Sequence, residues 1–137
     1  MLALVASDLH GSLKAAEFLV GREADLRPDL VILLGDHLYH GPRNPLPEGY
    51  SASETAAALQ GLQAPVAALR GNCEAEVDEL LLPWTLADSA WLHLDGRLLL
   101  AVHGHQLPEN GGGLKLTPRV DVLFGHTHIR SVRPIQI

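Results

Sequence analysis

Seven side chains that can bind a metal occur in short clusters along the sequence. Each cluster follows a short apolar run, and glycines stand beside its members. A lone Asp or His in such a place is usually a cap or a hydrogen-bonded structural residue. Many such groups packed together would be costly unless cations neutralise them. The candidate ligands are Asp8, His10, Asp36, Asn72, His103, His126 and His128.

The ligand types indicate the class of metal. Two carboxylates, one amide oxygen and four imidazoles, with no thiolate required, suit Mn, Fe or Zn. Mg and Ca prefer a set made of oxygen atoms alone. Affinity alone does not select among Mn, Fe and Zn.

Five apolar runs precede the candidate ligands, and each is short enough to be a buried strand. They are residues 2–6, 30–34, 66–69, 98–102 and 120–124. Continuous apolarity suits a sheet covered on both faces. Strand ends at one edge of an open α/β sheet converge on a crevice, so ligands distant in sequence can be neighbours. The spacing of two residues within the first and last clusters predicts side chains on the same side, if the strand continues through them.

Helical and turn signals lie between these strands. The apolar spacing predicts one helix from Ser12 to Asp25. Ser51 and Glu54 form a candidate capping box for a second helix that continues to Leu62. The dipeptide at residues 95–96, Asp-Gly, predicts a hairpin between residues 91–94 and 97–100. Residues 40–50 and 105–118 read as loops. We expect one α/β domain over residues 1–137.

Composition limits the class of protein. The chain has 137 residues, 47% of them hydrophobic, which suits a single buried core. A net charge of −6 argues against nucleic-acid binding through phosphate neutralisation. The single Cys73 cannot form an internal disulfide, which is compatible with a reducing cytosol. We expect a cytoplasmic protein, because the apolar start lacks a basic region and no run is long enough to span a membrane.

The chain resembles the calcineurin-like metallophosphoesterase family. The segments SDLHGS, LLGDH, RGNCE, HGH and GHTH match the signature blocks of that family in order. The segments HGPRN and LPEGY extend the resemblance to its YfcE-type subgroup of small bacterial phosphodiesterases. The resemblance implies an α/β fold, a two-sheet αββα sandwich with the site at the strand ends. Relatives continue beyond GHTH, whereas this chain ends nine residues after His128, so we expect a C-terminally shortened form.

The family resemblance also implies roles for the seven ligands. Asp8, His10 and His128 would hold one divalent metal ion, and Asn72, His103 and His126 would hold a second. Asp36 would bridge the two ions, with Mn the first choice and Fe or Zn the alternatives. A hydroxide shared by both ions would attack a small phosphodiester in line, while the ions offset the charge on its oxygens.

Three further residues are candidates for catalysis or substrate binding. Many family members have His where Cys73 stands, and a thiol is a poor acid at neutral pH, which favours activated esters with good leaving groups. Inert packing is the alternative for Cys73. His105 could orient a ligand or donate a proton, and Arg43 could supply a cation for the phosphate. A structural His and a solvated Arg are the alternatives. We assign His37, His40 and His93 to structure, and Trp84, Trp91 and Phe124 to packing.

Other functions stay open at this point. The same family includes a retromer subunit that serves mainly as a protein scaffold, although here every ligand position has a competent side chain. A phosphomonoesterase, a nuclease or a cyclic nucleotide hydrolase could use the same metals, but the acidic charge makes a polynucleotide less attractive. We expect no membrane partner. Unpaired sheet edges at the short C-terminus predict a homo-oligomer.

Overall fold

The computed structural model describes residues 1–107 and 120–128. Most of its helices and strands coincide with the expected ones. In chain order they are β1 (Ala3–Ala6), α1 (Leu13–Leu26), β2 (Leu30–Leu33), α2 (Ala52–Leu59), β3 (Val66–Ala68), the 3-10 helix η1 (Glu76–Leu80), β4 (Ser89–Leu94), β5 (Arg97–Val102) and β6 (Val120–Phe124).

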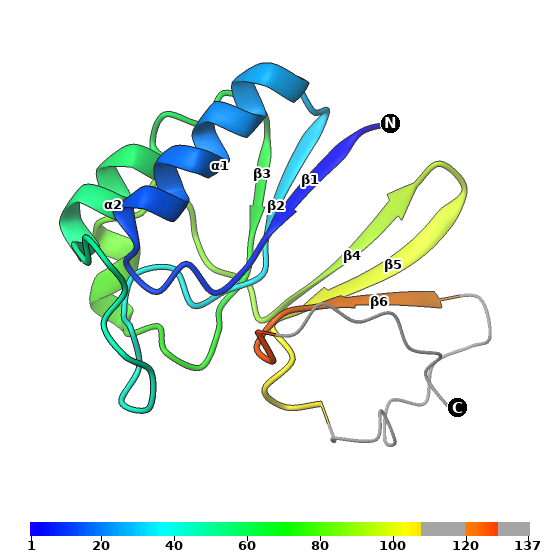
Figure 1. Cartoon of the computed structure of the whole chain (residues 1–137). Coiled ribbons are helices and arrows are strands. Elements are labelled where there is room, and N and C mark those ends of the chain that lie inside the picture. Colours follow the sequence, from blue (N-terminus) through cyan, green and yellow to red (C-terminus); the bar gives the residue numbers. More distant parts are fainter. Residues whose placement is uncertain (108–119, 129–137) are drawn as a thin grey trace.

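The strands form two three-stranded sheets. In the first sheet, β1, β2 and β3 are parallel and β2 is central. In the second sheet, β5 is central, antiparallel to β4 and parallel to β6. Helices α1 and α2 cover one face of the first sheet, and the second sheet lies on its other side (Figure 1). The predicted α/β class with two sheets is therefore confirmed.

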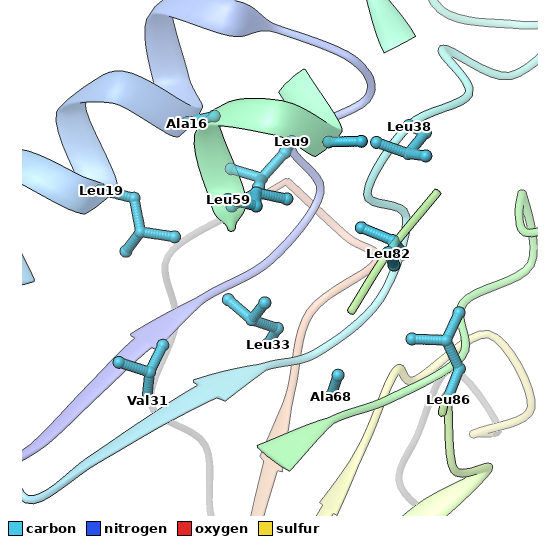
Figure 2. Packing of buried hydrophobic residues seen from close by; sticks show 11 residues of the cluster. Leu9, Ala16, Leu19, Val31, Leu33, Leu38, Leu59, Ala68, Leu82 and Leu86 are labelled. Carbon is cyan, nitrogen blue, oxygen red and sulfur yellow. The ribbon is translucent and has the colours of Figure 1, made fainter. Parts of the chain in front are cut away.

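Apolar residues in and directly after strand β2 pack against other elements on both faces of the first sheet. Val31 and Leu33 pack in a cluster with the two helices, which Figure 2 shows from close by. Ile32 and Leu34 belong instead to a second cluster, which includes Ala101 of the other sheet. Successive strand residues point to opposite faces, so an unbroken apolar run supplies both contacts at once.

Local signals set the ends of the helices and the hairpin. The Ser12 hydroxyl accepts the Ala15 N–H at 3.3 Å, and the Ser51 hydroxyl accepts the Glu54 N–H at the same distance. These bonds satisfy backbone donors that have no partner within the helix. Asp95 and Gly96 both have positive φ, 47° and 79°, as a two-residue hairpin turn requires.

Two differences from the expectations concern the helices. Helix α2 ends at Leu59, before the predicted end at Leu62. The 3-10 helix η1 was not predicted. The loop expected over residues 105–118 lies outside the described residues from 108 onwards. Within the described ranges, no helix combines the length and the apolar character needed to cross a membrane.

Candidate metal centre

The seven predicted ligands lie just beyond the carboxyl ends of five strands, and their side chains converge. On one side of the cluster, the Nε2 atoms of His10 and His128 are 3.1 Å apart. Asp8 Oδ1 lies 3.3 Å from His128 Nε2 and 3.8 Å from His10 Nε2. These three donors therefore surround one small volume, on a scale that suits a single cation.

A second group of donors lies on the other side of Asp36. Asn72 Oδ1 is 3.0 Å from His103 Nε2, and the rings of His103 and His126 have centroids 5.1 Å apart. Asp36 Oδ2 lies 3.4 Å from His103 Nε2 and 3.7 Å from His10 Nε2. One carboxylate oxygen thus stands between an imidazole of each group.

The hydrogen bonds of two histidines favour the tautomer that can bind a metal. His10 Nδ1 lies 2.8 Å from the carbonyl oxygen of Tyr39, and His103 Nδ1 lies 2.8 Å from that of Leu34. A carbonyl oxygen can only accept, so each Nδ1 carries the proton and donates. In the neutral ring, Nε2 then presents a lone pair to the cluster, as metal-ligating histidines do.

Asp8 also has a carboxylate oxygen placed to bind a cation. Its Oδ2 accepts the His126 N–H at 2.9 Å, which fixes the carboxylate. Among the described residues, its Oδ1 is buried without a hydrogen-bond partner. A buried carboxylate oxygen with no donor is costly, and a divalent cation beside it would remove that cost. The donor set therefore fits divalent metal ions.

The ligand backbones correct one expectation. The strands do not continue through the ligand pairs, because Asp8, His10, His126 and His128 have φ values of 57°, 49°, 66° and 54°. Asp36 also has a positive φ of 56°. Left-handed conformations are costly for residues other than glycine and cluster at functional sites. After β1, β2 and β6 the backbone therefore turns tightly at the ligands instead of continuing as a strand.

Two of the glycines beside the ligands allow different loops to approach closely. A Cβ atom at Gly71 would overlap the Asp36 side chain, and one at Gly125 would overlap Ser7 and come too close to Asp8. Both glycines therefore pack against a carboxylate from another strand. Without a Cβ atom, glycine permits this close approach, and at both positions the neighbour is a candidate ligand.

Glu74 is a residue of the site that the sequence analysis did not single out. Its side chain is 1% exposed and accepts N–H groups from the loops after β2 and β3. The donors are the backbone of Asp36 at 3.0 Å, the backbones of His37 and Gly71, and the His37 ring at 3.0 Å. Glu74 thereby joins the loops that carry Asp36 and Asn72. Glu74 lies in the RGNCE segment, but nothing in the sequence indicated which N–H groups would donate to its carboxylate.

The ionisable groups at the centre of the site shift one another's pKa values. Burial alone would raise the pKa of Asp36, but hydrogen bonds with His103 and the Cys73 N–H lower that pKa to about 2. Burial disfavours charge on His103, yet the bond and attraction to Asp36 outweigh it and raise the His103 pKa. Burial and repulsion from His103 lower the pKa of His126. Burial and the charge of Asp36 raise the pKa of Cys73 to about 12.

A groove of about 660 Å³ opens beside the cluster. Asp36, Asn72, His126 and His128 line it, together with Arg43 and Cys73. His105 is exposed and lies near the second group, with its ring centroid 5.5 Å from that of His103. Arg43, Cys73 and His105 thus lie close to the ligands. His37 is buried against Glu74, which agrees with a structural role.

Comparison with known proteins identifies the family of this domain. The model of the calcineurin-like phosphoesterase superfamily domain matches residues 1–136. The phosphodiesterase YfcE of Escherichia coli strain K12 is 41% identical over 133 residues, which are 94% of this chain and 70% of that protein. YfcE is described in its solved structure as a phosphoesterase, and that structure matches with a TM-score of 0.83 at 37% identity, over 98% of this chain and 75% of that one.

More distant solved structures share the fold. An archaeal phosphodiesterase matches with a TM-score of 0.57 at 18% identity, over 77% of this chain and 61% of that one. A conserved protein of Streptococcus pneumoniae TIGR4, a predicted phosphoesterase, matches with a TM-score of 0.55 at 21% identity, over 94% of this chain and 63% of that one. At these identities the likeness concerns the fold alone.

Proposed function

This chain belongs to the calcineurin-like phosphoesterase superfamily, and we propose that it hydrolyses small phosphodiesters with the help of two divalent metal ions. The observation that carries the proposal is the position of Asp36. Its Oδ2 atom lies within 3.7 Å of an imidazole nitrogen from each of the two donor groups. A carboxylate that bridges two metal ions has to lie between the two groups of ligands, as Asp36 does.

The seven side chains would divide between the two ions. Asp8, His10 and His128 would hold one ion, Asn72, His103 and His126 the other, and Asp36 both. When bound, the ions would supply an activated water as the nucleophile and would offset the negative charge of the phosphate. Manganese is our first choice, with iron or zinc as alternatives, because of the mixed imidazole and oxygen ligands.

The groove residues would handle the substrate. Arg43 and Asn72 would bind the phosphate oxygens, because a guanidinium and an amide can both donate hydrogen bonds to them. His105 would supply a proton to the leaving group or orient a ligand. The Cys73 thiol, with its pKa raised to about 12, stays protonated at neutral pH in the metal-free protein and is a weak donor there. Substrates with good leaving groups should therefore react fastest.

Several other expectations remain part of the proposal. We propose one domain over residues 1–137, a cytoplasmic location and no nucleic-acid partner. Self-association also stays a prediction: among the described strands β4 pairs only with β5, and its Trp91 is 55% exposed. A phosphomonoesterase or a protein-interaction scaffold would be the alternative functions of the same fold.

The direct test is metal-dependent hydrolysis. The protein is stripped with a chelator, Mn²⁺ is restored, and hydrolysis of bis(p-nitrophenyl) phosphate and of p-nitrophenyl phosphate is measured. We expect Mn²⁺ to restore turnover of the diester, and Asp36→Asn to lower kcat/KM by at least about a hundredfold. The variant also controls for contaminating enzymes.

Three results would contradict the proposal. A folded, metal-loaded protein that hydrolyses neither ester would favour the scaffold alternative. A strong preference for the monoester would make the phosphomonoesterase reading the better one. Equal activity in the wild type and in Asp36→Asn would assign the hydrolysis to another protein in the sample.

A further inference from the structure

A second, apolar hollow lies beside the metal groove. It has a volume of about 350 Å³, and its lining includes Tyr39, Tyr50, Cys73, Ala75 and Val77. Val77 belongs to the 3-10 helix η1 and is 58% exposed. Apolar surface that stays open to solvent next to a polar site is characteristic of ligand-binding sites. We call this hollow the apolar pocket.

The apolar pocket adjoins the metal groove. Tyr39 and Cys73 line both hollows, so these two residues form the border between them. The Cys73 N–H donates to Asp36 Oδ1 at 2.9 Å, and this bond holds the Cys73 backbone next to the central carboxylate. A ligand with its phosphate among the metal ligands would have these two side chains next to it, and the apolar pocket directly beyond them.

The chemistry of the lining selects the part of the ligand that enters. Among the described residues of the lining, Asp78 is the one carboxylate, and its Oδ2 accepts the Ala75 N–H at 2.9 Å. A carboxylate repels a phosphate, so the phosphate itself should stay in the groove beside Arg43. The remaining lining residues are apolar or aromatic. The apolar pocket therefore suits an uncharged apolar group.

The size and the aromatic side chains favour a ring. A cavity of about 150 Å³ is enough for benzene, so the apolar pocket can receive a single aromatic ring. Tyr39 and Tyr50 flank His40, with ring centroids 4.8 Å and 5.3 Å from it in edge-to-face geometry. These contacts hold the two tyrosines in place, and aromatic rings attract other rings in offset or edge-to-face arrangements.

We propose that the apolar pocket binds an aromatic ester group of the phosphodiester whose phosphate lies in the metal groove. The inference rests on the proposed function, and it names the substrate class: diesters with at least one aromatic substituent. The pocket would contribute to binding and to specificity, whereas the chemistry would take place among the metal ligands.

The experiment separates binding from hydrolysis. Calorimetry on the Mn²⁺-loaded protein measures the dissociation constants of diphenyl phosphate and dimethyl phosphate, two diesters with poor leaving groups. We expect diphenyl phosphate to bind at least about tenfold more tightly, because a buried ring leaves water. Val77→Asn should reduce this preference by about three- to tenfold, because it puts an uncharged polar group in the lining.

Leu80→Asn is the matched control. Leu80 lies on the same 3-10 helix, is 82% exposed and is not part of the pocket lining. Both substituted residues are exposed, so both variants should fold, which circular dichroism checks. The control variant should keep the wild-type preference for diphenyl phosphate.

The outcomes for the pocket and for the proposed function are distinct. Equal binding of the two diesters by the wild type, or equal preference in the Val77 and Leu80 variants, would overturn the pocket even if bis(p-nitrophenyl) phosphate is hydrolysed. A preference that depends on Val77, in a protein that hydrolyses no ester, would support the pocket and refute the proposed enzyme.

Discussion

Asp36 and His103 form a buried pair at the centre of the donor cluster. Their side chains are 2% and 1% exposed, and Asp36 Oδ2 lies 3.4 Å from His103 Nε2. Without metal, a proton on His103 can neutralise the carboxylate, which accounts for the raised pKa of the imidazole. A metal ion would take the place of that proton, so protons and metal should compete for these residues.

The pair makes the stability of the metal-free protein depend on pH. The pKa of Asp36 falls from 3.8 to about 2, so its stabilisation is complete above pH 3.8 and is lost as the pH falls towards 2. The pKa of His103 is raised above 6.5, so its stabilisation is complete below pH 6.5 and is lost as the pH rises through the folded-state pKa. We expect the pair to stabilise the fold most between about pH 3.8 and 6.5.

Urea unfolding of chelator-treated protein checks this window. The difference in unfolding free energy between the wild type and Asp36→Asn should be largest inside the window, by on the order of 1 to 2 kcal/mol, and should shrink on both sides. Asp121→Asn, which removes an exposed partner of Arg97, serves as the control. A difference that stays constant from pH 3 to pH 9 would refute the account of the pair.

At the scale of elements, the loops after β2 and β3 carry ligands and are joined by Glu74. Its carboxylate accepts several N–H groups, among them the backbone of Asp36 at 3.0 Å. Hydrogen bonding with His37 lowers the pKa of Glu74 despite its burial, so the group stays ionised and can accept. A rigid connection between the two loops should hold Asp36 and Asn72 at the spacing that the metals need.

Replacing Glu74 by Gln tests this positioning role. Gln has one acceptor oxygen and brings an NH₂ group towards backbone N–H donors, so at least one buried donor would lose its partner. We expect Glu74→Gln to weaken Mn²⁺ binding by about ten- to a hundredfold in chelator competition. Glu79→Gln, which alters the more exposed ion pair with Arg70, should leave Mn²⁺ affinity unchanged. A variant with lower stability but wild-type Mn²⁺ affinity would show that Glu74 is structural only.

The sequence predicted the regular elements better than the loops. Apolar runs such as residues 30–34 identify strands because β2 is buried on both faces. The Asp95-Gly96 turn is local chemistry and could be recognised directly. The left-handed backbone of Asp8 and His10 was not predictable, because bonds from Asp8 N–H to Gly35 O and from His10 N–H to Asp36 O hold it, and these join segments distant in sequence. The N–H groups that donate to Glu74 could not be predicted for the same reason.

At the scale of the whole molecule, the candidate centre joins the two sheets. The first sheet leads to Asp8, His10, Asp36 and Asn72, and the second leads to His103, His126 and His128. Metal ions held by both sets would connect the sheets and should stabilise the folded state over the unfolded chain. The arrangement of layers is therefore part of the site, because each sheet alone offers an incomplete set of ligands.

The number of metal ions per chain tests the central claim most directly. Native mass spectrometry of protein reconstituted with Mn²⁺ should show two ions per folded chain. Asp36→Asn should lose this two-ion state, because the bridging carboxylate is gone, whereas Asp121→Asn should keep it. A wild-type chain that binds a single ion or none at saturating Mn²⁺ would contradict the dinuclear centre.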